Sequence, residues 1–442
     1  MAIRRRTGLL VVGVAALFLL GLMFVGPVLL RVDRYRPELI SYLQKKTGKQ
    51  IEIGRLALTV FPVALHMDRF GTKNPPSFPV GYVFRASRID AELSLSALLR
   101  RQVVITSLSL DEPILNMTSD PDGPWNFENP QAKLSQNNFP LGLISRVQIR
   151  RGHLVASNLL SSDAEGPIFF EAHEIFCDLQ QVNLMDLIDP SSSSVDGQGS
   201  LKAGLLRFGA MQATNLESEF RLEARHVFFS GIRADFYAGI AVGDLAFDLS
   251  GKDVNFKTSA QLMGINVAQL LAAFPNGGGK MTGKMEADLK LTGEIAHSIR
   301  PLAGMLGTGH VTVRNGQLPS LKLNANLMKL AHFNDLGPAK DNPSSFSSIS
   351  TDLELANLRI SSKAIDIDGY GVDVDGSGSV SVSGSDELDY QGVAAITTKQ
   401  GFLTNMFGRL EGAKLKDGKL SFPFRIGGTI DSPKFSKGSK EK

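Results

Sequence analysis

The chain has 442 residues, of which 43% are hydrophobic and 21% are charged, and its formal net charge is +3. This apolar content is sufficient to fold most of the chain, and so small a net charge argues against a nucleic-acid partner. The single cysteine, Cys177, excludes an intramolecular disulfide but does not identify the compartment. Glycine makes up about a tenth of the chain, above the usual share of about 7%, which indicates many turns between short strands.

An uncharged run lies near the start of the chain. Residues 7–30 carry no charge and are mostly apolar, and three arginines at positions 4–6 precede them. At about 1.5 Å per residue, a helix of this length crosses a hydrocarbon core of about 30 Å. The alternative is a cleaved signal peptide, but the run is longer than the usual apolar region and no small-residue cleavage site follows it. We predict that residues 1–34 form an N-terminal tail and a transmembrane anchor.

A short helix is predicted directly after the anchor. Pro37 suits the first helical turn, Leu39 and Leu43 lie on one apolar stripe, and Gly48 suits the C-terminal cap. Two placements remain open. The helix either lies at the membrane interface, with the lysines at positions 45, 46 and 49 towards lipid headgroups, or plugs the end of a sheet.

From Gln50 onward the hydrophobic period changes from 3.6 to 2, which is typical of strands with one buried face. Leu56 and Leu58 continue in the opposite phase to the apolar residues before them, which predicts a bulge near Gly54. We expect the alternating apolar residues of the first strands to point into one apolar surface. These candidate lipid-binding residues are Ile51, Ile53, Leu65, Met67, Leu93, Leu108 and Leu110.

Alternating strands continue to near the C-terminus, on the order of 20 in all. Short helices are predicted at 267–274, with Asn266 as N-cap, and at 320–333. The serine-rich stretch at 191–194 is the best boundary, which gives β domains at 195–436 and 35–190 and a disordered tail at 437–442. We expect the two helices and the serine stretch to interrupt any continuous stack of strands.

Several sequence motifs follow one another in a recognisable order. Residues 47–60 read TGKQIEIGRLALTV, residues 88–117 read RIDAELSLSALLRRQVVITSLSLDEPILNM, and residues 123–129 read GPWNFEN. Near the C-terminus, residues 307–318 read GTGHVTVRNGQL and residues 422–435 read FPFRIGGTIDSPKF. In this order they resemble the AsmA family, although Trp125 and Asn126 are swapped relative to the family's usual Asn-Trp and Lys49 stands where arginine is commoner. The resemblance implies an elongated β-sheet groove similar to those of bridge-type lipid-transfer proteins, and a role in outer-membrane lipid homeostasis.

Catalytic patterns are incomplete throughout. Residues 278–284 have the spacing of a phosphate-binding loop, but Met285 replaces the required Ser or Thr and the residues that follow alternate like a strand. The aspartates between 366 and 375 do not complete a calcium loop, and no H-x-x-x-H pair or G-x-S-x-G elbow occurs. Cys177 lies in an apolar run and is predicted to be a core residue. We therefore predict no enzymatic activity, no cofactor, no metal, and no nucleotide or nucleic-acid partner.

The remaining signal is a sheet with one apolar and one polar face. An ordinary globule covers the apolar face with a second layer, but few helical segments are available here to do so. A curled, uncovered sheet forms a groove for acyl chains. Our leading interpretation is a mainly β, single-pass inner-membrane protein with its bulk in the periplasm. Its elongated, mostly antiparallel β groove binds or transfers membrane phospholipids for outer-membrane biogenesis. The alternative is a non-transporting scaffold or regulator that binds envelope assembly proteins, with the sheet closed by packing.

Overall fold

The structure, a computed structural model, describes most of the chain after the predicted anchor. The described residues are 32–100, 102, 104–120, 125–127, 143–161, 164–183, 197–223, 226–250, 254–274, 277–295, 304–331, 344–381, 387–397, 414–416 and 419–438.

Strands dominate the described residues, and the helices between them are short. The helices are η1 (Val32–Tyr35), α2 (Arg36–Thr47), α3 (Leu95–Leu99), α5 (Val267–Ala272) and α6 (Leu323–Leu330). The strands are β1 (Ile51–Val60), β2 (Val63–Lys73), β3 (Tyr82–Leu93), β4 (Ile105–Asp111), β5 (Ile114–Ser119), β6 (Leu143–Ser161), β7 (Ala164–Asn183), β8 (Gly197–Phe208), β9 (Met211–Glu223), β10 (His226–Phe236), β11 (Gly239–Asp248), β12 (Val254–Asn266), β13 (Lys284–Ile295), β14 (Leu306–Gln317), β15 (Ser345–Ala356), β16 (Arg359–Gly369), β17 (Val372–Ser381), β18 (Leu388–Thr397), β19 (Lys414–Lys416), β20 (Lys419–Gly428) and β21 (Pro433–Lys437). The predicted mainly β class is confirmed.

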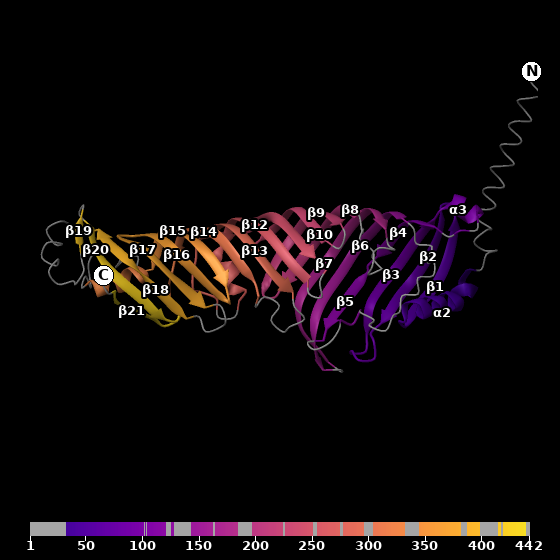
Figure 1. The fold of residues 1–442 in the computed structure, drawn as a ribbon, viewed down its shortest axis with the longest axis horizontal. Helices are drawn as coiled ribbons and strands as arrows, with labels where there is room; N and C mark the ends of the chain where they lie inside the picture. Colours follow the sequence, from indigo (N-terminus) through magenta and orange to yellow (C-terminus); the bar gives the residue numbers. More distant parts are fainter. Residues whose placement is uncertain are drawn as a thin grey trace, which may run out of the picture. The chain divides into compact units, whose positions relative to one another are not determined.

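The chain divides into two compact units. The first comprises the residues up to Gly209 together with Asn215–Val227, and the second comprises Ala210–Thr214 together with Phe228–Lys442. In the first unit, β1, β2 and β3 pair antiparallel in chain order (Figure 1). Strand β3 then pairs with both β4 and β5, and these two strands pair parallel with β6 before β7 and β8 continue antiparallel. The predicted mostly antiparallel pairing is confirmed, with these parallel pairs as the exception.

The predicted bulge near Gly54 takes the form of a change of phase within β1. Ile51, Ile53 and Leu56 are buried, whereas Glu52 and Arg55 between them are exposed. The register between β1 and β2 is the same on both sides of this point, because the partner strand changes phase as well, at Arg69 with a φ of 53°. A residue in the left-handed region interrupts the two-residue alternation of side chains along a strand. The apolar residues before and after it therefore project from the same face of the sheet.

The residues just before β1 cover its outer edge. The Asp33 carboxylate accepts a hydrogen bond from the Leu56 amide at 2.9 Å, Arg36 donates to the Gly54 carbonyl, and Gln44 donates to the Ile51 carbonyl at 3.2 Å. Gly48 ends α2 in the left-handed conformation, as predicted. The structure therefore shows the predicted helix at the sheet edge. Its placement at a membrane interface stays a prediction.

In the second unit, each strand from β11 to β18 pairs antiparallel with the next strand in the chain, and β20 follows β18. Strands β12 and β13 pair directly although α5 lies between them in sequence, and β14 and β15 do so across α6. In the first unit, β7 and β8 pair across the serine-rich stretch. The prediction that these segments interrupt the stack is wrong, because the strands on either side of each segment pair directly with one another.

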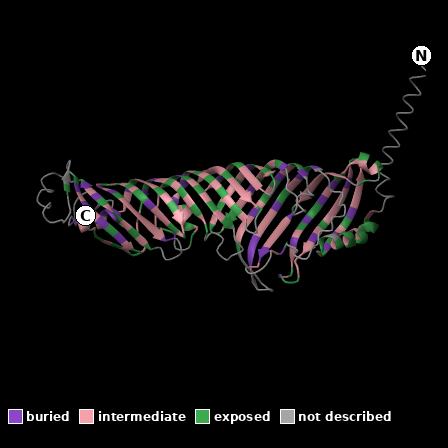
Figure 2. Ribbon diagram, in the orientation of Figure 1, coloured by how far each residue is buried: buried purple, intermediate pink, exposed green. Residues whose placement is uncertain are grey.

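Both inserted helices are attached by identifiable contacts. The side chain of Asn266 accepts a hydrogen bond from the Gln269 amide at 3.2 Å, which confirms the predicted N-cap of α5. Helix α6 packs its buried face, which includes Leu323 and Leu327, onto β17, β18 and β20. Figure 2 shows how buried, intermediate and exposed residues are distributed along the strands.

Some predicted features lie outside the described residues. These are the transmembrane segment at 7–30, the serine stretch at 191–194 and the last residues of the tail, 439–442. None of the helices that the structure describes combines the length and the apolar character needed to cross a bilayer. The predicted domain boundary at 190–195 stays a prediction.

Candidate functional site

Apolar side chains align across the strands of the first unit. In one row, Leu65 of β2 pairs with Ala91, which pairs with Leu108, and the row continues to Val147 and Leu179. Residues directly opposite in a sheet project from the same face. The adjoining row on that face contains Met67, Ile89, Leu110, Ile149 and Cys177.

The seven residues predicted from sequence fall into three groups. Leu65, Met67, Leu108 and Leu110 lie together in the two adjoining rows of the apolar face. Leu93 lies at the end of β3, opposite Ile105 and after a register shift. Ile51 and Ile53 lie beyond the change of phase, where they are buried and pair with Thr72 and Phe70. The structure thus brings four of the seven into direct cross-strand alignment.

The opposite face of the same strands is polar. His66 pairs with Asp90, and Asp90 accepts hydrogen bonds from His66 at 2.5 Å and from Arg88 at 2.7 Å. Burial raises the pKa of Asp90, but the hydrogen bonds from Arg88 and His66 outweigh it and hold this pKa below the ordinary value. Further along, the hydrogen bond from Arg146 lowers the pKa of Asp178. The first unit therefore has one apolar face and one face of paired charges.

The second unit repeats this division over β11 to β15. Its central apolar row runs from Gly243 through Ala260, Leu289 and Gly309 to Leu353. We call this row and the two beside it the second-unit apolar face. The flanking rows are Leu245, Thr258, Leu291, Gly307 and Leu355 on one side and Ala241, Leu262, Ala287, Val311 and Thr351 on the other.

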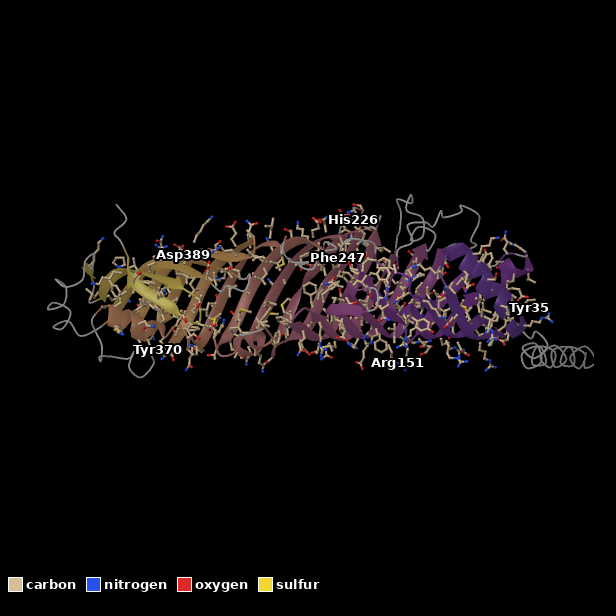
Figure 3. All side chains as sticks on the ribbon, turned by 90° about the horizontal axis from the view of Figure 1, so that it is seen from below. Tyr35, Arg151, His226, Phe247, Tyr370 and Asp389 are labelled. Carbon is tan, nitrogen blue, oxygen red and sulfur yellow. The ribbon has the colours of Figure 1, made fainter. Side chains whose placement is uncertain are left out.

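Burial follows the same two-residue period on these strands. Along β13, Leu289 and Leu291 are half-buried, while Asp288 and Lys290 are exposed. Along β15, Leu353 and Leu355 are half-buried, while their polar neighbours are exposed. Side chains covered by a second layer would be fully buried, so the described residues leave this part of the apolar face open. Figure 3 shows the side chains and labels Phe247, whose ring lies 6.1 Å from that of Phe229.

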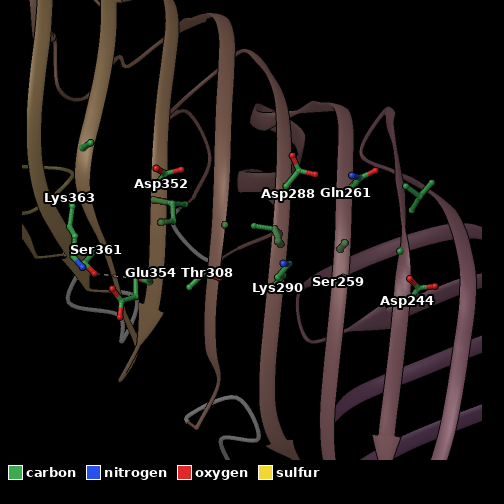
Figure 4. A pocket seen from close by; sticks show the side chains of 17 residues that line it. Asp244, Ser259, Gln261, Asp288, Lys290, Thr308, Asp352, Glu354, Ser361 and Lys363 are labelled. Atoms are coloured by element: carbon green, nitrogen blue, oxygen red, sulfur yellow. Dashed lines mark hydrogen bonds between the residues drawn. The ribbon is translucent and has the colours of Figure 1, made fainter.

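A hollow of about 700 Å³ is formed by residues of β11 to β16 (Figure 4). Its lining includes the whole central row together with residues that alternate with that row along each strand and project from the polar face, such as Asp288, Lys290 and Glu354. On the apolar side, Gly243 and Gly309 add no side chain to the central row. A Cβ at Gly309 would lie 2.6 Å from both the Asp288 carbonyl and the Leu289 side chain, so a larger residue there would force a shift.

Helices cover the apolar side in other parts of the second unit. Leu327 of α6 is fully buried against Ala394, Ile396 and Leu420. Val267 of α5 packs with Val313 and Phe346 in a separate cluster. The apolar side of the second unit is thus open along the central row and the Leu291 row. It is closed near Val313, where α5 packs, and over β17, β18 and β20, where α6 packs.

Cys177 is a core residue, as the apolar sequence around it predicted. It is buried in the first unit, where its partner residues in the sheet are Ile149 and Leu201. Burial, with a further contribution from Asp178, raises the pKa of its thiol to about 11. A thiol in this environment is a packing residue and a poor nucleophile.

Sequence reasoning missed the second-unit apolar face as a candidate site. The alternation of Met285, Ala287, Leu289 and Leu291 marks a strand, but it does not show which strands stand beside it. The two glycines of the central row also carry no hydrophobic signal, although they share the face. Only the register between strands brings these residues together.

Fold and site together define a mainly β protein whose sheets keep part of an apolar face open. Residues 3–157 match the model of the AsmA family. This match confirms, over the N-terminal part of the chain, the resemblance found in the sequence. A search of curated proteins found no match.

Proposed function

We propose that this chain binds phospholipids along its open apolar face and holds or transfers them for the biogenesis of the outer membrane. The observation that carries the proposal is the half-buried state of Leu289 and Leu291 on β13 and of Leu353 and Leu355 on β15, two strands that both pair with β14. A row of such residues offers a continuous apolar track. The match of residues 3–157 to the AsmA family supports the same function by analogy.

The physical case rests on the cost of exposed apolar surface. Removing such surface from water is favourable by about 25 cal/mol per Å², or about 0.8 kcal/mol for each buried CH₂ group. An acyl chain lying on the central row would cover the leucine side chains of that row. It would fit closely over Gly243 and Gly309, because these residues have no side chain. The charged residues that alternate with this row, such as Asp288 and Lys290, project from the opposite face and would remain in water.

The proposed setting is the bacterial envelope. Residues 7–30 would anchor the chain in the inner membrane, and the β units would lie in the periplasm, next to the membrane that supplies the lipid. Envelope assembly proteins would be its other partners. A reporter fused at the C-terminus tests this topology, because activity of a cytoplasm-only reporter would contradict a periplasmic placement.

The lipid proposal is tested by extracting the purified full-length protein and identifying co-purified lipids by mass spectrometry. Two matched pairs of variants place a new charge on opposite faces of one strand. Leu289→Glu and Leu108→Asp put it on the apolar face, while Lys290→Glu and Ser109→Asp put it on the polar face. The apolar-face variants are expected to lose bound lipid, and their polar-face neighbours are expected to retain it.

Circular dichroism of each variant separates loss of lipid from loss of fold. A folded Leu289→Glu variant with the lipid content of the unmodified protein would contradict a lipid track on this face. Absence of lipid from the unmodified protein, together with stable capture of an envelope assembly protein, would favour the scaffold or regulator instead.

A further inference from the structure

Two histidines and a glutamate converge on the polar face of the first unit. The Nε2 atom of His173 lies 2.5 Å from Oε1 of Glu171, and the Nε2 atom of His153 lies 3.7 Å from the same oxygen. The two imidazole rings have centroids 3.7 Å apart. One ligand atom from each residue therefore falls within 4.8 Å of the other two.

Strand pairing explains how residues so far apart in sequence meet. Leu154 of β6 pairs with Ala172 of β7. Arg151 and Glu174, with φ of 53° and 52°, change the phase of the two strands as Arg69 does in β2, so the Leu154 and Ala172 side chains lie on the apolar side with Ile149 and Cys177. The residues next to them project from the opposite face, so His153 lies across from His173 and diagonal to Glu171. The cluster thus occupies the face away from the proposed lipid track.

The surroundings hold the carboxylate in place. Arg207 of β8 donates a hydrogen bond to Oε2 of Glu171 at 3.2 Å, which leaves Oε1 directed at the two imidazoles. Glu171 is the most buried of the three side chains, and both histidines keep part of their surface in solvent. A carboxylate fixed by a second hydrogen bond and facing partly open histidines has the outer support that metal ligands commonly have.

We propose that His153, Glu171 and His173 form a binding site for a borderline divalent transition-metal ion such as Zn²⁺. Two imidazole nitrogens and one carboxylate oxygen are a donor set that such ions accept, and three protein ligands leave a coordination position open. In a tetrahedral zinc site, ligand atoms stand about 3.4 Å apart. The separation of 3.7 Å fits this directly, while the separation of 2.5 Å would open by about 0.9 Å to admit the ion. A bound ion would link β6 to β7 and present its open position to solvent.

The experiment measures Zn²⁺ binding to the full chain, produced without a histidine tag and stripped with a chelator. Calorimetry gives stoichiometry and affinity, and the visible spectrum of Co²⁺ in place of Zn²⁺ reports the coordination geometry. We expect one site per chain. His173→Ala and the conservative Glu171→Gln should each weaken it by more than about 10-fold, because loss of a direct ligand exceeds the usual effect of an outer-shell change.

His310→Ala is the matched control, since His310 is an exposed histidine beside a carboxylate, 2.8 Å from Asp352, but belongs to no such cluster among the described residues. It should leave zinc binding unchanged. Equal affinity in the unmodified chain and in folded Glu171→Gln, or equal loss in His310→Ala, would overturn the proposal. Because the site lies on the polar face, lipid content measured in the same variants stays unchanged whichever way the zinc result falls.

Discussion

Replacing Asn126 with alanine should destabilise the first unit more than any change at an exposed polar residue. The Asn126 side chain is fully buried. Its oxygen accepts a hydrogen bond from the Thr118 amide at 3.0 Å, and its amide group donates to the Asn116 carbonyl at 2.9 Å and to Asn74 Oδ1 at 3.1 Å. The alanine variant keeps the backbone bond from its own amide to the Thr118 carbonyl but loses all three side-chain bonds.

The magnitude follows from the groups left behind. A buried donor or acceptor without a partner costs about 1–3 kcal/mol, and the Thr118 amide and the Asn116 carbonyl are both left in that state. Asn74 retains its bond to the Pro79 carbonyl and sits nearer the surface, so its loss adds little. We expect the free energy of unfolding to fall by about 2–6 kcal/mol.

The assay is urea denaturation followed by the fluorescence of Trp125, which is the single tryptophan of the chain and adjoins the mutated residue. Its ring stacks on Phe127 with centroids 5.7 Å apart, so unfolding of this region changes its environment. Asn255→Ala, at an exposed position of β12, is the control and should stay within about 0.5 kcal/mol of the unmodified protein. A change that small in Asn126→Ala would refute the reasoning.

Three further predictions concern single side chains. The pKa of Asp90 lies below its ordinary value of 3.8, so the stability that its ionised form contributes is complete above that pH and is lost on further acidification. In a series of urea denaturations at falling pH, Asp90→Asn should reduce the loss of unfolding free energy at the acid end. Asp352→Asn, at an exposed pair, is the control and should not. Cys177, with a thiol pKa of about 11, should resist a maleimide at pH 8 and react once urea unfolds the chain; rapid labelling of the folded protein would contradict its burial. Leu327→Ala should cost about 2–5 kcal/mol by opening a cavity under α6, and Leu306→Ala, at an exposed site, should cost little; equal effects would show that α6 is not packed as described.

Local features were predictable from sequence because short stretches of chain determine them. The change of hydrophobic phase at Gly54 predicted where β1 alters its facing, and Pro37 and Gly48 predicted the limits of α2. Asn266 predicted the start of α5 for the same reason, since an N-cap bonds within its own first turn.

Features that depend on strand pairing were not predictable. The meeting of His153 with His173 requires the register of β6 on β7, which no local motif encodes. The parallel pairing of β4 and β5 with β6 was missed because alternation is the same in parallel and antiparallel strands. The prediction that α5 and α6 interrupt the stack was wrong. An apolar stripe on a helix indicates that the helix packs against the sheet, but it does not indicate whether the helix lies between strands or on their face.

The pairing of each strand from β11 to β18 with its successor makes this part of the chain modular. Where neither α5 nor α6 covers it, a hairpin in such an array contacts little beyond the strands on either side of it. Solenoid proteins are similar, and their stability is close to a sum of nearest-neighbour terms. Evolution can therefore insert or delete a hairpin without redesigning a shared core. The length of the apolar track becomes a property that selection can adjust by duplication, two strands at a time, while its width and the polarity of its two faces stay the same.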